Sequence, residues 1–105
     1  MNKFRLLLAA AYLLGLSACA TSVSPEAQKV IETSDEKIVQ GCTHLGEVRG
    51  TSNVGGLLFT TGKENAMNEA IEKAAQRGAT HILWKRARGL PLGGSAEGVA
   101  YRCGQ

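Results

Sequence analysis

An uncharged apolar segment near the start of the chain places the tightest limit on what the rest can form. This segment runs from Leu6 to Leu16 and follows a short stretch that carries Lys3 and Arg5. A basic start followed by an apolar run of this length has the shape of a secretory signal. A permanent membrane-spanning helix needs about 20 apolar residues, and this segment is near half that length. The sequence therefore predicts an exported protein.

The apolar segment ends in Leu16-Ser17-Ala18-Cys19, a quartet that resembles the lipobox of bacterial lipoproteins. In such proteins a dedicated peptidase cuts before the cysteine once its thiol carries a diacylglycerol. The resemblance implies that residues 1–18 are the signal peptide and that Cys19 is the lipidation site. The alternative is an ordinary signal peptide with a chance cysteine, because Ala18-Cys19-Ala20 also fits an Ala-x-Ala-like cleavage site.

The lipoprotein interpretation also predicts where the protein resides. A mature lipoprotein of this kind carries three acyl chains, and two chains already give stable anchoring, so the membrane is an expected partner. Lipoproteins that stay in the inner membrane tend to carry Asp after the lipidated cysteine, whereas Ala20 follows Cys19 here. The expected location is therefore the periplasmic face of the outer membrane, with the lipid in its inner leaflet.

The remaining chain is long enough for one small domain. Removal of residues 1–18 would leave 87 of the 105 residues, which supports a single core. The formal net charge of +3 includes Lys3 and Arg5, so the mature chain would carry +1. A charge this small does not support nucleic-acid binding, and we expect no such partner. We assign residues 19–27 to a lipidated tether, because they are mostly small and polar, and residues 28–105 to the folded domain.

The other two cysteines are expected to form a disulfide. If Cys19 is acylated, Cys42 and Cys103 remain, and cysteines in an oxidising compartment tend to pair. Cys42 would lie early in its strand and Cys103 at the end of the last strand. If these strands are antiparallel neighbours, the two cysteines meet at one end of the sheet, within the Cα separation of about 4.4 to 6.8 Å that a disulfide needs.

A metal site is the alternative use of these cysteines. Cys and His are good zinc ligands, and Cys42 stands near His44, while His81 could join Cys103. The disulfide is the stronger interpretation, because two cysteines in an oxidising compartment tend to form a bridge and single histidines on strands are more often surface or edge residues. Enzymatic activity is not expected either: Asp35 is the sole aspartate, and Ser95 lacks the second glycine of a G-x-S-x-G motif. We predict no metal and no cofactor.

One amphipathic helix is the best-defined element. Thr61-Gly62-Lys63-Glu64 has the form of a capping box, which predicts the helix start. Glu69 and Lys73 stand four residues apart on the expected outer face, and Gly78 is suited to end the helix with a positive φ. The apolar residues that recur at helical spacing are Ala66, Met67, Ala70, Ile71, Ala74 and Ala75.

Strands are predicted on both sides of this helix. Before it we expect strands at residues 28–32 and 37–49, the second one bent at Gly41 and Gly46. After it we expect strands at residues 80–88 and 99–103, separated by a loop at 89–95. The predicted fold is α+β in the order β-β-α-β-β, with a small mixed or antiparallel sheet of three to four strands, one helix and one disulfide. We expect the apolar Leu57-Leu58-Phe59 to contribute to the core, and Trp84 to lie in the core or on a face of the sheet.

A compact basic run is the main candidate for partner contact. Lys85, Arg86 and Arg88 could meet phosphate groups of lipid or the acidic surface of a protein. A solvated strand end is the alternative interpretation of these charges. Phe59 is a further candidate contact residue, in case its apolar segment is exposed.

Several of these segments together resemble a family of small, uncharacterised outer-membrane lipoproteins of proteobacteria. The resemblance rests on Gly41-Cys42 with Leu45-Gly46-Glu47-Val48, on Gly78-Ala79-Thr80-His81 and on the ending Ala100-Tyr101-Arg102-Cys103. It spans roughly residues 28–103 and implies a lipid-anchored envelope protein. We expect a non-enzymatic structural or interaction module whose partner is an envelope protein or the cell wall.

The layout is more distantly similar to the outer-membrane sensor lipoprotein of the Rcs envelope-stress pathway. That type has a long Pro-rich tether and four cysteines in two disulfides, whereas this chain has a short tether and one possible pair. The fold is therefore expected to carry over, and signalling is not. A regulatory sensor is the alternative function, and a metal-binding module is the third.

Overall fold

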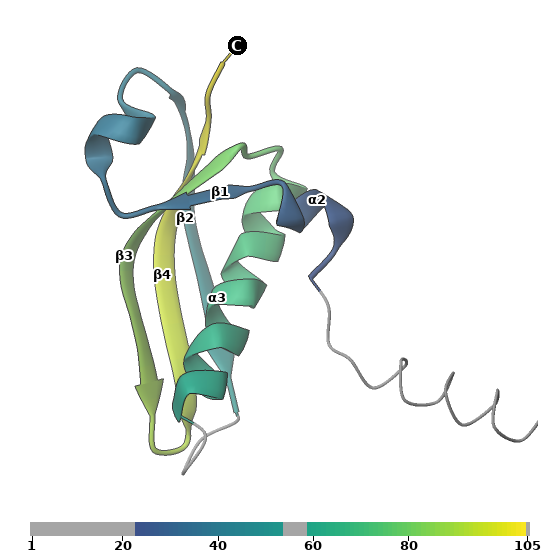
Figure 1. Cartoon of the computed structure of the whole chain (residues 1–105), viewed down its shortest axis with the longest axis vertical. Helices are drawn as coiled ribbons and strands as arrows, with labels where there is room; N and C mark the ends of the chain where they lie inside the picture. Colours follow the sequence, from purple (N-terminus) through teal and green to yellow (C-terminus); the bar gives the residue numbers. More distant parts are fainter. Residues whose placement is uncertain (1–22, 54–58, 105) are drawn as a thin grey trace, which may run out of the picture.

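The computed structural model describes residues 23–53 and 59–104 of the chain. The predicted signal peptide, Cys19 and the apolar Leu57-Leu58 lie outside these residues. The predicted α+β fold, with strands on both sides of one main helix and one disulfide, is confirmed (Figure 1). The described elements are α2 (Pro25–Gln28), β1 (Ile31–Thr33), the 3₁₀ helix η1 (Glu36–Val39), β2 (Thr43–Ser52), α3 (Phe59–Gln76), β3 (His81–Leu90) and β4 (Gly93–Arg102).

The strands form one mixed sheet in the order β1-β3-β4-β2. β1 is parallel to β3, whereas β4 is antiparallel to both of its neighbours. Helix α3 covers one face of the sheet and runs along it, while η1 stands beside the upper end of the sheet (Figure 1). β1 is three residues long and pairs only with His81–Leu83, so most of β3 extends beyond it.

A Schellman motif ends helix α3 as predicted. Gly78 has a φ of +78°, which an L side chain rarely adopts. Its N–H donates to the carbonyl of Ala75 at 3.0 Å, and the N–H of Ala79 donates to the carbonyl of Ala74 at 3.0 Å. These two hydrogen bonds satisfy carbonyls that the helix itself leaves open. The predicted start was wrong, because the helix begins at Phe59 and Thr61 lies inside it.

Small residues bring α3 unusually close to the sheet. A Cβ atom added at Gly50 of β2 would overlap the carbonyl oxygen of Ala66, and one at Gly94 of β4 would overlap the carbonyl oxygen of Gly62. Backbone therefore meets backbone at this interface, and glycine is the residue that permits such an approach. On the helix side, alanines supply the rest of the contact, since Ala66 and Ala70 are both fully buried.

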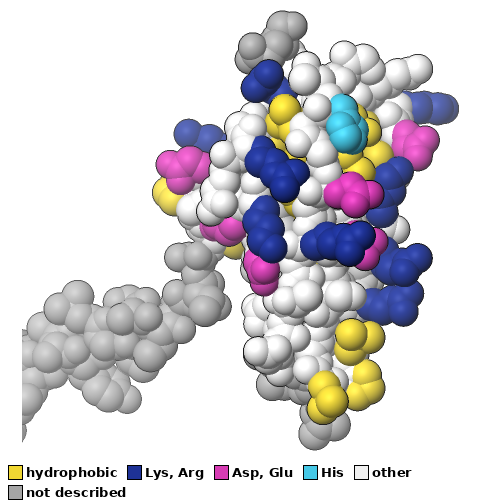
Figure 2. All heavy atoms as spheres, turned by 180° about the vertical axis from the view of Figure 1, so that it is seen from behind, with side chains coloured by type: hydrophobic (Ala, Val, Ile, Leu, Met, Phe, Trp, Pro, Cys, Tyr) yellow, Lys and Arg dark blue, Asp and Glu magenta, His cyan; other side chains and the backbone are white. Residues whose placement is uncertain are grey.

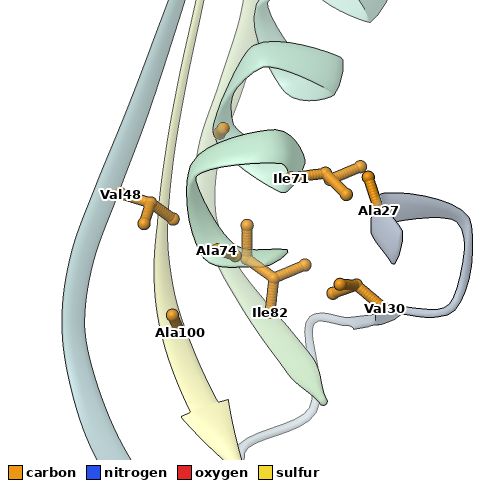
Figure 3. Close-up of a cluster of buried hydrophobic side chains, with 8 residues drawn as sticks. Ala27, Val30, Val48, Ile71, Ala74, Ile82 and Ala100 are labelled. Atoms are coloured by element: carbon orange, nitrogen blue, oxygen red, sulfur yellow. The ribbon is translucent and has the colours of Figure 1, made fainter. Parts of the chain in front are cut away.

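The larger apolar side chains gather at the other end of α3. Ile82, Leu83 and Val48 are the largest fully buried side chains. Ile82 and Val48 belong to a cluster in which Ala74 of α3 is also fully buried, so the predicted apolar face of the helix is correct (Figure 3). Trp84 is half-buried and packs against this cluster, as predicted.

The folded part begins before the predicted boundary at residue 28. Helix α2 packs on α3, and Ala27 and Val30 contribute to the core from the N-terminal side (Figure 3). Ser24 donates to the carboxylate of Glu72 from its backbone N–H at 2.6 Å and from its hydroxyl at 2.9 Å. The predicted end of the tether at residue 27 was therefore too late. Ser24 is the N-cap of α2, and Pro25 is the first residue of that helix.

Two of the predicted strand boundaries also need correction. The segment predicted as one strand at residues 37–49 contains the helix η1 and only the first part of β2. η1 forms because the Asp35 carboxylate accepts a hydrogen bond from the N–H of Lys37 at 3.0 Å. Gly41, with a φ of +79°, then turns the chain into β2. The first predicted strand is displaced as well, since β1 starts at Ile31.

The predicted loop at residues 89–95 is mostly strand. β3 ends at Leu90 and β4 begins at Gly93, so only Pro91 and Leu92 form the turn between them. Of the glycines that suggested a loop, Gly89 lies in β3, whereas Gly93 and Gly94 lie in β4, where β2 and α3 approach them closely. A Cβ atom at Gly93 would overlap the carbonyl oxygen of Ser52.

Candidate functional site

The predicted disulfide joins the two chain segments at one end of the β2–β4 pair. Cys42 directly precedes β2 and Cys103 directly follows β4. Thr43 and Arg102 are partners in this antiparallel pair, so the cysteine Cα atoms lie 4.6 Å apart and the sulfurs are bonded. The predicted antiparallel arrangement is confirmed. The N–H of Cys103 donates to the hydroxyl of Thr80 at 2.8 Å, which ties this end of β4 to the start of β3.

The two histidines of the alternative metal site flank one tyrosine. His44 and His81 are both partners of Tyr101, one from β2 and one from β3. The His44 ring meets the Tyr101 ring edge-on, with centroids 5.6 Å apart, and His81 Nδ1 lies 2.8 Å from the hydroxyl of Thr80. Both thiols of the alternative site are consumed by the disulfide. Within residues 23–53 and 59–104, no group of three His, Cys, Asp or Glu side chains is placed to hold a metal ion.

An open hollow of about 580 Å³ lies beside the disulfide. It is lined by η1, by the residues that lead into β2, and by Leu83, Lys85 and Tyr101 of the sheet. Val39 of η1 is also part of this lining and is 5% exposed. The Lys85 ammonium lies 3.3 Å from the Glu36 carboxylate, so one of the predicted contact residues is engaged in an ion pair here.

The basic run predicted for partner contact lies on β3 beyond the reach of β1. Arg86 stands opposite Glu97 of β4, and Arg88 stands opposite Ser95. Both arginines and Lys85 are exposed, and the face of the sheet opposite α3 carries many Lys and Arg side chains (Figure 2). The structure therefore brings the three predicted basic residues together at one edge. Phe59 begins α3, but its side chain lies outside what is described.

Apolar side chains adjoin this basic stretch at the hairpin turn. Leu90 is 38% exposed and Leu92 is 89% exposed, and both stand at the tip where β3 passes into β4. Hydrophobic side chains gather at this end of the molecule, next to the Lys and Arg side chains (Figure 2). The sequence pattern predicts a loop at this tip and gives no signal for a contact role of either leucine.

The opposite edge of the sheet is closed by side chains from α3. Glu69 accepts a hydrogen bond from the N–H of Thr51 at 3.3 Å. Lys73 Nζ donates to the carbonyl of Arg49 at 2.8 Å, and Arg77 donates to the carbonyl of Glu47 at 2.8 Å. These side chains thus satisfy three backbone groups on the free side of the edge strand β2.

Only part of this arrangement is predictable from the sequence. The predicted pairing of Glu69 with Lys73 is confirmed at 3.0 Å. The hydrogen bond from Lys73 is the main cause of a lowered pKa of the Glu69 carboxyl, and the N–H of Thr51 adds to it. The contacts to β2 were missed, although Glu69, Lys73 and Arg77 recur at every fourth position and so share one face of the helix.

Comparisons with known protein families, with curated proteins and with solved structures find no match. Among the described residues, no helix is long and apolar enough to cross a membrane.

Proposed function

We propose that this chain is a non-enzymatic lipoprotein of the bacterial outer membrane. The lipid on Cys19 would hold a small domain at the periplasmic face, where it acts as a structural or interaction module of the envelope. The observation that carries this proposal is the Cys42–Cys103 bond. Disulfides persist in oxidising compartments, and the bond leaves Cys19, directly after the apolar segment, as the third cysteine of the sequence.

The surface of the domain supports an interaction role. The exposed basic residues of β3 lie next to the exposed leucines of the hairpin tip, and exposed apolar groups beside charges are typical of contact sites. Membrane attachment would hold this stretch near other envelope components. The partner would be an envelope protein or the cell wall.

Metabolic labelling tests the lipid anchor. Cells that express the chain and receive radioactive fatty acid should yield a labelled protein that fractionates with the outer membrane. Cys19→Ser should be unlabelled and uncleaved, because serine cannot form the thioether. The double variant Cys42→Ser and Cys103→Ser is the matched control and should keep its label. Normal labelling of Cys19→Ser would refute the proposal.

The alternative sensor role predicts a different phenotype. Deletion of the gene would silence an envelope-stress reporter if the protein is a sensor. A structural or interaction module should instead change barrier function, for example sensitivity to large antibiotics, while the reporter still responds. The resemblance in element order supports the sensor role only at the level of the fold.

A further inference from the structure

The two edges of the sheet differ in whether their outward backbone groups have hydrogen-bond partners. On the β2 side, Glu69, Lys73 and Arg77 bond to three of the backbone groups that point away from β4, between Glu47 and Thr51. On the other side, β1 covers only His81–Leu83, and β3 continues to Leu90. Side chains of α3 thus cover the middle of one edge, and the other edge is uncovered over its second half.

The register shows which backbone groups are free on β3. Leu90 and Gly93 close the two-residue turn and are hydrogen-bonded partners, and residues along an antiparallel pair alternate between bonded and non-bonded positions. Arg88 and Arg86 therefore bond to β4, and Ala87 and Gly89 direct their N–H and C=O groups outward. In the part of the chain that the structure describes, these outward groups have no hydrogen-bond partner.

The side chains along this edge favour one kind of added strand. Arg86 and Arg88 are exposed and pair with Glu97 and Ser95 of β4. These positions alternate with Gly94, which lies against α3, so both arginines are on the face opposite that helix. Lys85 sits in a β-bulge beside them. A second copy of the chain would place its own arginines against these, and like charges directly opposite are destabilising. An acidic strand would instead gain cross-strand ion pairs. The exposed Leu90 offers an apolar contact at the next position on the same face.

We propose that the outer edge of β3 from Lys85 to Leu90 binds an extended acidic segment of another envelope protein as an additional strand. The segment would carry acidic residues at alternate positions, opposite Arg86 and Arg88, and an apolar residue at the adjoining alternate position, opposite Leu90. Main-chain hydrogen bonds to Ala87 and Gly89 supply affinity, and alternate side chains supply specificity. This inference deepens the proposed function by naming the class of partner, and it rests on that function for the compartment alone.

Peptide binding to the purified lipidated protein in nanodiscs of zwitterionic lipid tests this directly. The probe is a fluorescent peptide of alternating glutamate and valine that ends in leucine, and the control peptide has lysine in place of glutamate. The acidic peptide should bind and the basic peptide should not. Arg88→Glu, whose cross-strand partner is the uncharged Ser95, should weaken binding of the acidic peptide by about tenfold and favour the basic one. Lys63→Glu makes the same change in net charge at an exposed position of α3 and should leave binding unchanged.

Hydrogen exchange locates the peptide. The acidic peptide should slow amide exchange at Ala87 and Gly89 and leave Thr51, on the closed edge, unchanged. Ala87→Pro should abolish binding, because it removes an outward donor while proline is tolerated on edge strands. Should that variant fail to fold, the reversal of preference by Arg88→Glu remains decisive. Equal binding of both peptides would overturn the proposal. Protection of Ala87 and Gly89 by anionic nanodiscs without peptide would also overturn it, and would indicate that this edge contacts a lipid surface. Neither result would alter the fatty-acid labelling of Cys19.

Discussion

Replacing Gly50 with alanine tests the close contact between α3 and the sheet. The new Cβ atom would overlap the carbonyl oxygen of Ala66 and stand 2.9 Å from both the carbonyl carbon of Ala66 and the nitrogen of Ala70. All three atoms belong to the backbone of the helix, so no side-chain rotation can relieve the overlap. The helix must move away from β2, which also strains the contacts of Glu69, Lys73 and Arg77 with that strand.

The expected loss of stability is large for a domain of this size. Overpacking a close-packed interior costs about 1–3 kcal/mol and occasionally more, and the backbone contacts place Gly50→Ala at about 3 kcal/mol or above. For a domain of this size, about 3 kcal/mol corresponds to a fall in melting temperature of about 12–24 °C. Thermal unfolding followed by circular dichroism measures this shift, and urea unfolding gives the free energy.

Gly98→Ala provides the matched control. Its Cβ atom would meet the Ile82 side chain at 3.0 Å and the carbonyl oxygen of Leu83 at 3.1 Å. The Ile82 side chain can adjust, so this variant should lose clearly less stability than Gly50→Ala. A Gly50→Ala protein that melts within a few degrees of the wild type would refute the claim that α3 lies against the backbone of β2.

Three further outcomes follow from the structure. Ala74→Asp should destabilise the domain by more than about 3 kcal/mol, because it buries an unpaired charge, whereas Asn68→Asp on the exposed side of α3 should melt near the wild type. Reduction of Cys42–Cys103, which are 61 residues apart in sequence, should cost about 4 kcal/mol on the chain-entropy estimate, and a reductant that leaves the melting temperature unchanged would contradict this. Folding lowers the pKa of Glu69 below its ordinary value of 4.5. The ionised Glu69 carboxylate therefore stabilises the fold above about pH 4.5, and this stabilisation is lost as the pH falls through the lower pKa of the folded state. Urea unfolding from pH 6 to 3 should show a smaller loss for Glu69→Gln than for the wild type, and parallel curves would argue against the interaction.

The sequence predicted the elements that depend on local or compositional signals. The end of α3 at Gly78 follows from the need for a positive φ, and the disulfide follows from two cysteines at matching ends of antiparallel strands. The apolar spacing also identified the buried face that includes Ala74. Each of these features is encoded within a few residues or by residue type.

The features that the sequence did not reveal depend on tertiary contacts. Gly93 and Gly94 have the composition of a loop, but they are strand residues because other parts of the backbone lie against them. The closed β2 edge depends on the placement of α3, and the open β3 edge depends on the shortness of β1. The sequence therefore identifies Lys85, Arg86 and Arg88 only as a basic run. The strand order is needed to show that they lie on a sheet edge to which a further strand could be added.

The position of the disulfide sets how the domain would respond to a pull from its N-terminal side. Such a force would first peel away α2, β1 and η1, which precede Cys42 and include only three strand residues. Residues 23–41 could lengthen to about 65 Å at about 3.4 Å per residue. Extension would then stop at Cys42, because the bond to Cys103 transfers the load across β2 and β4. With β1 gone, the open edge of β3 would begin at His81, so tension from the N-terminal side would lengthen the edge that an added strand could occupy.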